Sequence, residues 1–293
     1  MSCCTPSGPP LPPEEPVTHG GVEDVPMVDV PGGLALIGDE SGWAYPEDGE
    51  APVRHTPVNG FRLDVHAVSN SRFTAFVDAT GHVTSAERYG WSFVFGGALP
   101  DDFPDTRGVV GAPWWRQVEG ASWRHPEGPH SDLDGRADHP VVHVGADDAA
   151  AFAAWTGKRL PTEVEWEHAA RGGSVTTFPW GSELEPEGRH LANVWQGDFP
   201  SRNTCEDGFF TTCPVHAFPP NGYGLHNMIG NVWEWTADER TPGSGMRVLK
   251  GGSYLCHASY CRRYRPAARS SAAPTSSMGN AGFRCATDQR SAA

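Results

Sequence analysis

The stretch GKRLPTEVEWEHAARGG (157–173) carries the strongest local pattern in the chain. Thr162 follows Pro161 and precedes Glu165 by three residues, which is the spacing of a helix capping box. A glycine pair (172–173) stands at the other end, and glycine commonly ends helices by adopting the left-handed conformation. These signals predict a short helix with both ends defined.

Two further helices are expected upstream of this one. The segment ADDAAAFAAWTGKR (146–159) predicts the nearer helix. In SNSRFTAFVDATGH (69–82), Phe73 and Phe76 recur at helical spacing, and Gly81 is the expected stop.

The remaining segments predict strands and loops. MVDVPGGLALIGD (27–39) has two apolar runs broken by Pro-Gly-Gly, as in a hairpin, and NGFRLDVHAVS (59–69) predicts another strand. Residues 82–140 are rich in Pro, Gly and Trp and predict a long loop region, which in a compact domain is usually functional. Residues 174–290 predict short strands and loops. We therefore expect an α+β fold, a single loop-rich domain over 25–290.

Composition limits the class of protein. The 293 residues include 35 Gly, 27 Pro and 11 Trp, which indicates a turn-rich but folded chain. The net charge of −14 argues against nucleic acid or an anionic membrane as partner. No run reaches the ~20 apolar residues of a membrane span. The start, MSCCTPSGPPLPPEEP, lacks the features of a secretory signal, so the expected location is the cytoplasm and residues 1–24 are expected to form a disordered Pro-rich tail.

The segment GGSYLCHASYCRRYR (251–265) brings Cys256 and Cys261 within five positions. In a reducing compartment, paired cysteines are more often metal-binding or catalytic than disulfide-bonded. Nearby arginines favour the thiolate form, and two thiolates with few other ligands suit Cu(I). His257 keeps a zinc site open. A disulfide or a pair of inert thiols is the simpler alternative.

Other cysteines carry weaker signals. Cys205 and Cys213 suit a structural role, either as a small disulfide loop or as two buried thiols, because no further Cys or His nearby completes a zinc site. Cys3 and Cys4 lie in the Pro-rich tail, where no functional role is expected.

Two segments are rich in oxygen ligands. ANVWQGDFPSRNTCEDGFF (192–210) and HNMIGNVWEWTAD (226–238) hold Asn, Asp and Glu side chains between flexible turns, and calcium accepts such irregular oxygen sites. The alternatives are a solvated polar loop for the first segment and core packing for the second.

Several motifs together resemble one family. They are RHPEG (124–128), DHPVVHV (138–144), GKRLPTEVEWEHAARGG (157–173), FPPNGYGLHNMIGNVWEWTAD (218–238), LKGGSYLCHASYCRRYRPAARS (249–270) and GNAGFRC (279–285). They are similar to the formylglycine-generating enzymes, or sulfatase-modifying factors, over residues 25 to 288. The resemblance implies a C-type-lectin-like fold with little regular structure. GKRLPTE, GNVWEW and GFR occur widely in the superfamily, whereas the cysteine-pair segment is specific to the active enzymes.

The resemblance also implies an activity. The family uses O2 and an external thiol reductant to oxidise the cysteine of a Cys-x-Pro-x-Arg motif in unfolded sulfatases to Cα-formylglycine. Cys256 and Cys261 match its Cu(I) ligands, and Ser253 matches an active-site serine. The positions that match the walls of the substrate cleft are Tyr260, Arg269 and Asn280. Asp101, Asp102 and Asp105 are possible partners for the substrate arginine.

Two structural calcium ions are implied in the same way. The residues that match the first site are Asn193, Val194, Asp207 and Phe209. Those that match the second are Asn227, Gly230, Val232 and Glu234. Val194, Phe209, Gly230 and Val232 would contribute backbone carbonyls.

Departures from the family and rival functions complete the expectations. The extra cysteines of eukaryotic members are missing, which indicates a cytosolic, bacterial-type enzyme with Cys285 buried. One rival is an iron-dependent sulfoxide synthase of the same superfamily, which would need a three-histidine iron site and an added helical domain. The other is a non-catalytic, lectin-like binding module.

Overall fold

The protein is described by a computed structural model over residues 5–7, 20 and 25–289. Its centre is a four-stranded sheet in the order β12-β11-β10-β13. The strands are β10 Trp233–Glu239, β11 Arg247–Lys250, β12 Arg269–Ala272 and β13 Ala281–Gly282. Neighbouring strands are antiparallel, except that β13 runs parallel to β10.

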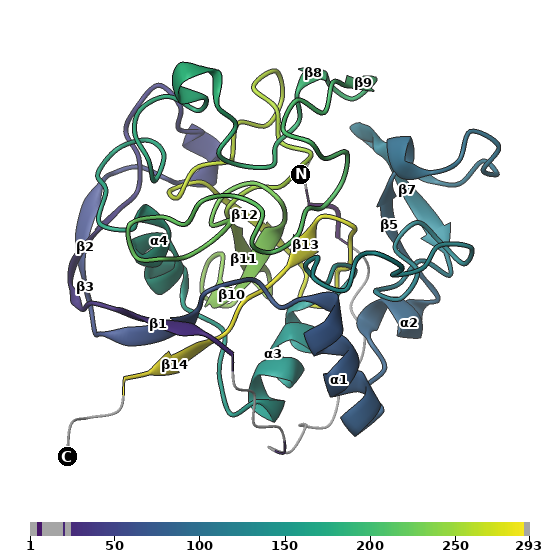
Figure 1. Ribbon diagram of the computed structural model, residues 1–293, viewed down its shortest axis with the longest axis horizontal. Coiled ribbons are helices and arrows are strands. Elements are labelled where there is room, and N and C mark those ends of the chain that lie inside the picture. Colours follow the sequence, from purple (N-terminus) through teal and green to yellow (C-terminus); the bar gives the residue numbers. More distant parts are fainter. Residues whose placement is uncertain (1–4, 8–19, 21–24, 290–293) are drawn as a thin grey trace.

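Two helices pack against this sheet, and a third packs on one of them (Figure 1). The helix α4 (Glu163–Arg171) contacts β10 and β11, while α3 (Ala146–Trp155) contacts β10 and α1 (Asn70–Thr80) contacts α3. All three predicted helices are confirmed. Thr162 and Glu165 form the capping box, and α1 ends at Gly81 in the left-handed conformation (φ 70°). The helix α3 ends four residues before the predicted position.

The predicted hairpin over 27–39 is wrong. The strand β1 (Met27–Val30) pairs with β4 (Phe61–Asp64), and β2 (Gly33–Ile37) pairs with β3 (Arg54–Val58). Segments 27–37 and 54–64 thus run antiparallel along their whole length. They break at the same level, where an added Cβ on Gly32 would lie 2.6 Å from the Gly60 nitrogen. Gly32 therefore allows two backbone segments to approach closely, and it does not form the turn of a hairpin.

The expectation of a long loop over 82–140 is wrong in part. This region holds a short helix, a three-stranded sheet in the order β5-β7-β6, and irregular connections. The elements are α2 Ser85–Tyr89, β5 Trp91–Phe95, β6 Gly108–Val109 and β7 Ala112–Glu119. The remaining elements are η1 Pro46–Asp48, η2 Gly96–Ala98, η3 Pro186–Gly188, β8 Gly197–Asp198, β9 Arg202–Asn203 and β14 Ala286–Asp288, and β14 pairs with β4. The α+β, loop-rich fold class is confirmed.

Aromatic side chains fill the core. Trp115, Trp123, Trp166, Trp233 and Trp235 are fully buried. Trp233 and Trp235 lie on β10, so core packing does occur in the segment 226–238, and Glu234 between them is buried too. The main cluster of buried apolar side chains also includes Cys256 and Cys261, so the cysteine pair lies within the packed interior.

Buried ion pairs hold the irregular segments. Glu167 of α4 lies between Lys250 and Arg171, at 3.0 and 2.9 Å, and accepts a hydrogen bond from the Gly38 N–H. Burial would raise the pKa of Glu167, but the charges of Lys250 and Arg171 hold it below its usual value. Arg265 likewise binds Glu50 with both ends buried. Such ion pairs hold together loop segments that lack the backbone hydrogen bonds of a helix or sheet.

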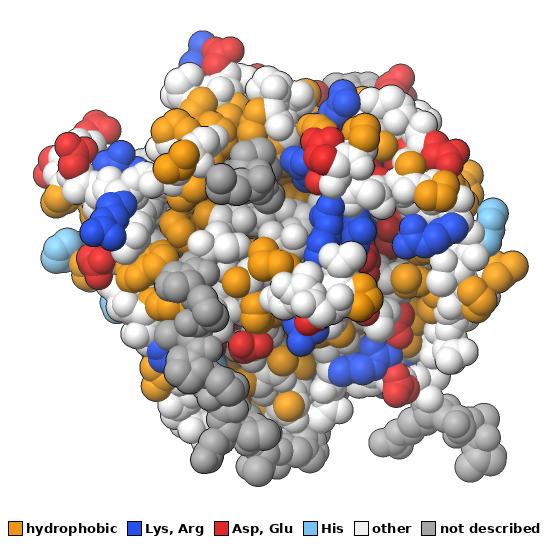
Figure 2. Space-filling view, turned by 180° about the vertical axis from the view of Figure 1, so that it is seen from behind, with side chains coloured by type: hydrophobic (Ala, Val, Ile, Leu, Met, Phe, Trp, Pro, Cys, Tyr) orange, Lys and Arg blue, Asp and Glu red, His pale blue; other side chains and the backbone are white. Residues whose placement is uncertain are grey.

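The surface mixes both signs of charge. On the face in Figure 2, acidic and basic side chains are interspersed among broad hydrophobic areas, so the net negative charge is not gathered there. Among the described residues, no helix is long and apolar enough to cross a membrane. Most of the expected disordered tail (1–24) lies outside the described residues. Within it, Gly20 donates to the Trp155 carbonyl, and Thr5–Ser7 contact the folded domain.

Candidate active site

The two cysteines of the 251–265 segment lie side by side. The chain leaves β11 through Gly251 and Gly252, both with positive φ (94° and 74°), and then turns so that the Cys256 N–H donates to the Ser253 carbonyl. The Cys261 N–H donates to the His257 carbonyl. The two Sγ atoms are 3.3 Å apart, well beyond the ~2.05 Å of a disulfide bond. Both residues are 0% exposed, so the site offers a shielded pair of sulfur donors.

Ser253 and Asn280 support this pair. The Ser253 N–H points at the Cys256 sulfur (3.4 Å), and the Ser253 Oγ accepts a hydrogen bond from Asn280 Nδ2 (2.9 Å). The Asn280 carbonyl accepts from the Trp233 N–H of β10. Ser253 is therefore fixed between the cysteine turn and the central sheet.

One of the arginines that follow the cysteine pair reaches a sulfur atom. Arg263 Nη1 lies 3.8 Å from Cys261 Sγ, and its Nε donates to Asp48 Oδ2 at 2.5 Å. Arg265 is committed to Glu50, and the Arg262 guanidinium lies over the Tyr45 ring at 5.3 Å. Among the arginines near the cysteine pair, Arg263 is thus the one that brings a positive charge next to a sulfur atom.

A cleft of 730 Å³ opens beside these groups. Tyr260 and Arg263 line it, and Tyr260 stacks on Phe199 with ring centroids 3.9 Å apart. The other lining residues include Tyr45, Glu47, Asp48, Phe93, Val109, Arg240, Met246, Ser270 and Ser271, and Thr5–Ser7 lie at one side. Tyr45, Glu47, Asp48 and Ser270 were missed from the sequence, because they come from distant segments and carry no motif of their own.

Comparison with known proteins supplies the family. Residues 14–289 match the model of the sulfatase-modifying factor enzyme 1-like domain. The chain is 54% identical to the formylglycine-generating enzyme of Thermomonospora curvata, covering 89% of this chain and 93% of that protein. For the enzyme of Streptomyces coelicolor, the identity is 55% and each chain is covered to 89%.

The chain belongs to the formylglycine-generating enzyme family.

More distant relatives show that membership of the family does not by itself establish the activity. A cattle protein named inactive C-alpha-formylglycine-generating enzyme 2 is 44% identical over 92% of this chain and 90% of its own length. The solved structure of PvdO from Pseudomonas aeruginosa covers 94% of this chain and 99% of its own, with a TM-score of 0.64 at 24% identity, which supports the fold alone. Since the family includes a member named inactive, the activity has to be argued from the site.

The residues expected to bind substrate do not all lie at the cleft. Tyr260 lies in the cleft wall, and Asn280 contacts Ser253. Arg269 of β12 does not line the cleft; its Nη2 donates to Glu163 Oε2 of α4 at 2.8 Å. Asp105 pairs with Arg116 at 3.1 Å, outside the cleft.

None of the three aspartates suggested for the substrate arginine lines the cleft; they are Asp101, Asp102 and Asp105. The carboxylates that line it are Glu47 and Asp48, and Asp48 is paired with Arg263. Glu47 is therefore the better placed acid for a basic ligand in this cleft.

The first expected calcium site is assembled around Asp207. Its carboxylate accepts hydrogen bonds from the Val194 N–H at 3.2 Å and the Phe209 N–H at 3.0 Å. Gln196 Nε2 donates both to this carboxylate and to the Val194 carbonyl. Burial raises the pKa of Asp207, and a cation beside it would oppose that effect. The structure thus brings the Asp207 carboxylate to the backbone of Val194 and Phe209, while the Asn193 side chain donates through Nδ2 to the Thr211 carbonyl at 2.8 Å.

At the second expected site, the carboxylate of Glu234 already accepts several hydrogen bonds from other side chains. Both oxygens of Glu234 are bound by Arg284, at 2.7 and 2.8 Å, and Trp166 Nε1 adds a third contact at 2.7 Å. A carboxylate has about four acceptor positions, so one remains. Asn227 Oδ1, in contrast, is buried with no hydrogen-bond partner among the described residues. An oxygen left in this state suits a cation.

Cys205 and Cys213 are free thiols in the structure, so of the two structural alternatives the disulfide is not formed. Cys213 is buried beside Asn227, whose Nδ2 is 3.9 Å from its sulfur, and burial raises its pKa to about 12. A neutral thiol that packs against the second oxygen-rich segment fits a structural role.

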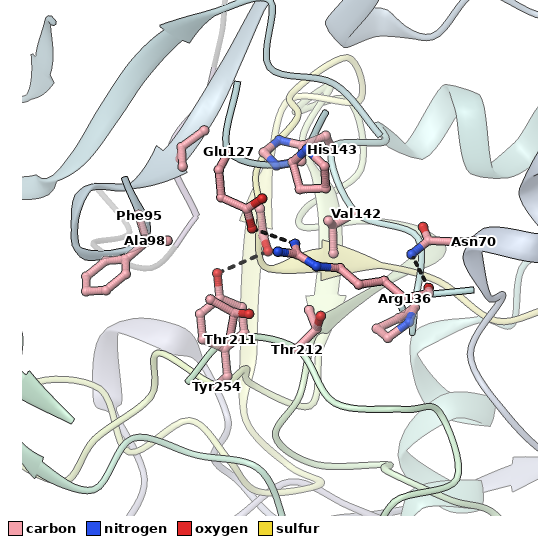
Figure 3. Close-up of a pocket in the computed structure, with 14 residues that line it drawn as sticks. Asn70, Phe95, Ala98, Glu127, Arg136, Val142, His143, Thr211, Thr212 and Tyr254 are labelled. Carbon is pink, nitrogen blue, oxygen red and sulfur yellow. Dashed lines mark hydrogen bonds and ion pairs between the residues drawn. The ribbon is translucent and has the colours of Figure 1, made fainter. Parts of the chain in front are cut away.

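A second, small pocket is lined in part by Tyr254 of the cysteine segment. Figure 3 shows Arg136 in its middle, bound to Glu127 at 2.6 Å, with Tyr254 below. The Tyr254 hydroxyl donates to the Gly279 carbonyl at 3.2 Å. With 20 Å³ the pocket has room for about one water molecule, which is too little for a substrate. The contacts of Arg136 and Tyr254 there hold the surrounding loops together.

The three-histidine iron site of the rival enzyme has no counterpart in the described part of the chain. No group of three or more His, Cys, Asp and Glu lies close enough there to share a metal ion. His66, His216 and His226 come near one another, but the His226 Nδ1 is bound to the Phe218 carbonyl.

Proposed function

We propose that this protein oxidises the cysteine of a Cys-x-Pro-x-Arg motif in unfolded sulfatase polypeptides to Cα-formylglycine, in the cytoplasm. The observation that carries the proposal is the pair of shielded sulfur atoms 3.3 Å apart beside an open cleft. Neighbouring thiols that pack only for structure would need no cleft and no arginine beside them.

The overall reaction requires both O2 and a thiol reductant. Converting the side chain –CH2SH to –CHO releases H2S and removes two electrons from the substrate. Full reduction of O2 takes four electrons, so two thiols of the reductant supply the other two and become a disulfide. One oxygen atom enters the aldehyde, and the other leaves as water.

Cu(I) fits the donor set at the cysteine pair. Cys256 and Cys261 present two soft sulfur atoms, and the nearest acid, Asp48, is held away by Arg263. Soft thiolates select Cu(I) over hard ions. When bound, Cu(I) supplies a soft redox centre that can accept a further sulfur ligand and exchange electrons with O2.

The protein's own side chains prepare this site. Arg263 favours the thiolate form of Cys261 by its positive charge. Asn280 orients the Ser253 hydroxyl by a hydrogen bond, and the Ser253 N–H lies 3.4 Å from the Cys256 sulfur. Tyr260, stacked on Phe199, forms a rigid wall that positions the substrate backbone and excludes water from the sulfurs.

Two calcium ions are proposed as structural partners. The support at the first site is that Gln196 Nε2 donates to both the Asp207 carboxylate and the Val194 carbonyl, and at the second it is the unpartnered Asn227 Oδ1. Both segments are irregular, so a bound cation would fix loops that no sheet holds.

A binding role without catalysis is the second candidate, favoured by the relative that is named inactive. One experiment separates the two. A Cys-x-Pro-x-Arg peptide is incubated with the protein, Cu(I), O2 and a thiol, and its mass is measured. We expect the cysteine to become an aldehyde, and a peptide with serine in its place to stay unchanged. Tight binding of the peptide with no conversion would support the second candidate.

A further inference from the structure

Three residues near the N-terminus form part of the cleft wall. Thr5 is 3% exposed, and its Oγ1 lies 2.7 Å from Ser270 Oγ. The same hydroxyl donates to the Ser271 carbonyl at 3.3 Å, and Ser7 Oγ accepts from the Ala273 N–H at 3.3 Å. Thr5–Ser7 therefore line the 730 Å³ cleft together with Tyr260 and Arg263.

The contacts follow one side of the central sheet. Among the described strands, β12 (Arg269–Ala272) is the last on that side, and Thr5 contacts its Ser270 and Ser271. An extended segment that lies along a sheet edge is a common mode of peptide binding. Here the segment is held by side-chain hydroxyls on both partners, at a position more than 260 residues away in the sequence.

The sequence of this segment matches the proposed substrate. Residues 4–8 read Cys-Thr-Pro-Ser-Gly, which has the cysteine and the proline of Cys-x-Pro-x-Arg at the right spacing. Glycine replaces the arginine. Thr5, Pro6 and Ser7, the described part of the match, line the cleft.

We propose that Thr5–Ser7 act as a tethered substrate mimic, which competes with the sulfatase motif for the cleft. This inference rests on the proposed function. A segment on the same chain has an effective concentration of the order of millimolar, so even a weak mimic competes. Gly8 lacks the guanidinium that could bind Glu47, and a true substrate therefore displaces the mimic.

Variants of the full-length chain test this. Thr5→Asp places an unpaired charge in a buried position, so the segment should leave the cleft. We expect the KM for the peptide to fall by about three- to tenfold, because the internal competitor is lost, with kcat unchanged. Thr18→Asp makes the same change elsewhere in the tail and should leave KM unaltered. Gly8→Arg completes the motif and should raise KM above that of the natural chain.

A second arm supplies the mimic from outside. The synthetic peptide MSCCTPSGPP, added to the Thr5→Asp chain, should inhibit competitively and restore the higher apparent KM. Equal KM values for the natural and Thr5→Asp chains would overturn the proposal. So would the appearance of an aldehyde at Cys4, since the segment would then be a substrate.

The proposal stays testable if no peptide is ever converted. The fluorescently labelled MSCCTPSGPP peptide is titrated against both chains, and its anisotropy is measured. Binding to the Thr5→Asp chain, and at least about threefold weaker binding to the natural chain, would support occupancy of the cleft even though the proposed function had failed. Equal or absent binding would overturn the mimic.

Discussion

At the scale of single residues, Ser253 is the residue beside the cysteine pair whose substitution best tests the proposed reaction. Ser253→Ala leaves the Asn280 Nδ2 donor without its acceptor, while the Ser253 N–H that contacts the Cys256 sulfur remains. We expect kcat for the peptide to fall at least about tenfold, equivalent to about 1.4 kcal/mol, with Cu(I) affinity unchanged. Ser259→Ala, at an exposed serine in the same segment, is the control. Equal loss in both variants would remove the special role of Ser253.

His143 links one residue to the pH dependence of stability. It is fully buried, and burial lowers its pKa from 6.5 to about 4. Between these values the unfolded chain binds more protons than the folded chain, so stability is present above pH 6.5 and is lost as the pH falls toward 4. The difference corresponds to about 3 kcal/mol.

Unfolding by urea at several pH values measures this effect. His143 has a positive φ of 59°, which asparagine tolerates best, so His143→Asn is the suitable variant. We expect it to flatten the decline in stability between pH 6.5 and 4. An unchanged slope would show that the histidine is not the titrating group.

At the scale of elements, the helix α4 is fastened by its buried carboxylate. Glu167→Gln removes the charge that balances Lys250 and Arg171, both of which remain buried. Losing one partner of a buried ion pair typically costs 3–5 kcal/mol, and urea unfolding should show about that loss. Glu47→Gln, at an exposed carboxylate, should cost less than about 0.5 kcal/mol. A similar small cost for Glu167→Gln would contradict the role of the ion pair.

The oxygen-rich loops are the elements most dependent on calcium. Excess chelator should lower the melting temperature, since a site filled at ~100 times its Kd contributes about 2.7 kcal/mol. Asp207→Ala should lower it in the same way and make the protein less sensitive to chelator. Asp198→Ala, in the same segment but exposed, is the control. A melting temperature that chelator leaves unchanged would count against structural calcium.

Local signals predicted the helices well and the strands poorly. Thr162 with Glu165, and Gly81, act within one turn of their helices, so the sequence contains what sets those ends. The strands β1 and β2 pair with residues 17 to 37 positions away, and the break at Pro31 and Gly32 could not reveal this. Aromatic strands such as β5 were hidden because Pro and Gly surround them.

At the scale of the whole molecule, the site combines a local motif with distant residues. Ser253, Cys256 and Cys261 lie within one segment, so their spacing and family resemblance could indicate them. The cleft walls come from Tyr45, Asp48 and Ser270, whose positions depend on the global fold. Arg269, chosen by resemblance, instead binds Glu163, which only the packing of α4 against the sheet determines.

The central claim is that Cys256 and Cys261 act as one two-sulfur site, and Cu(I) titration against a competing chelator tests it most directly. The natural chain and Cys205→Ser, a control at a thiol away from the cleft, should each bind one equivalent with the same affinity. Cys256→Ser and Cys261→Ser should both lose this binding, because serine is a poor ligand for a soft ion. Full Cu(I) affinity in Cys261→Ser would contradict the two-sulfur site.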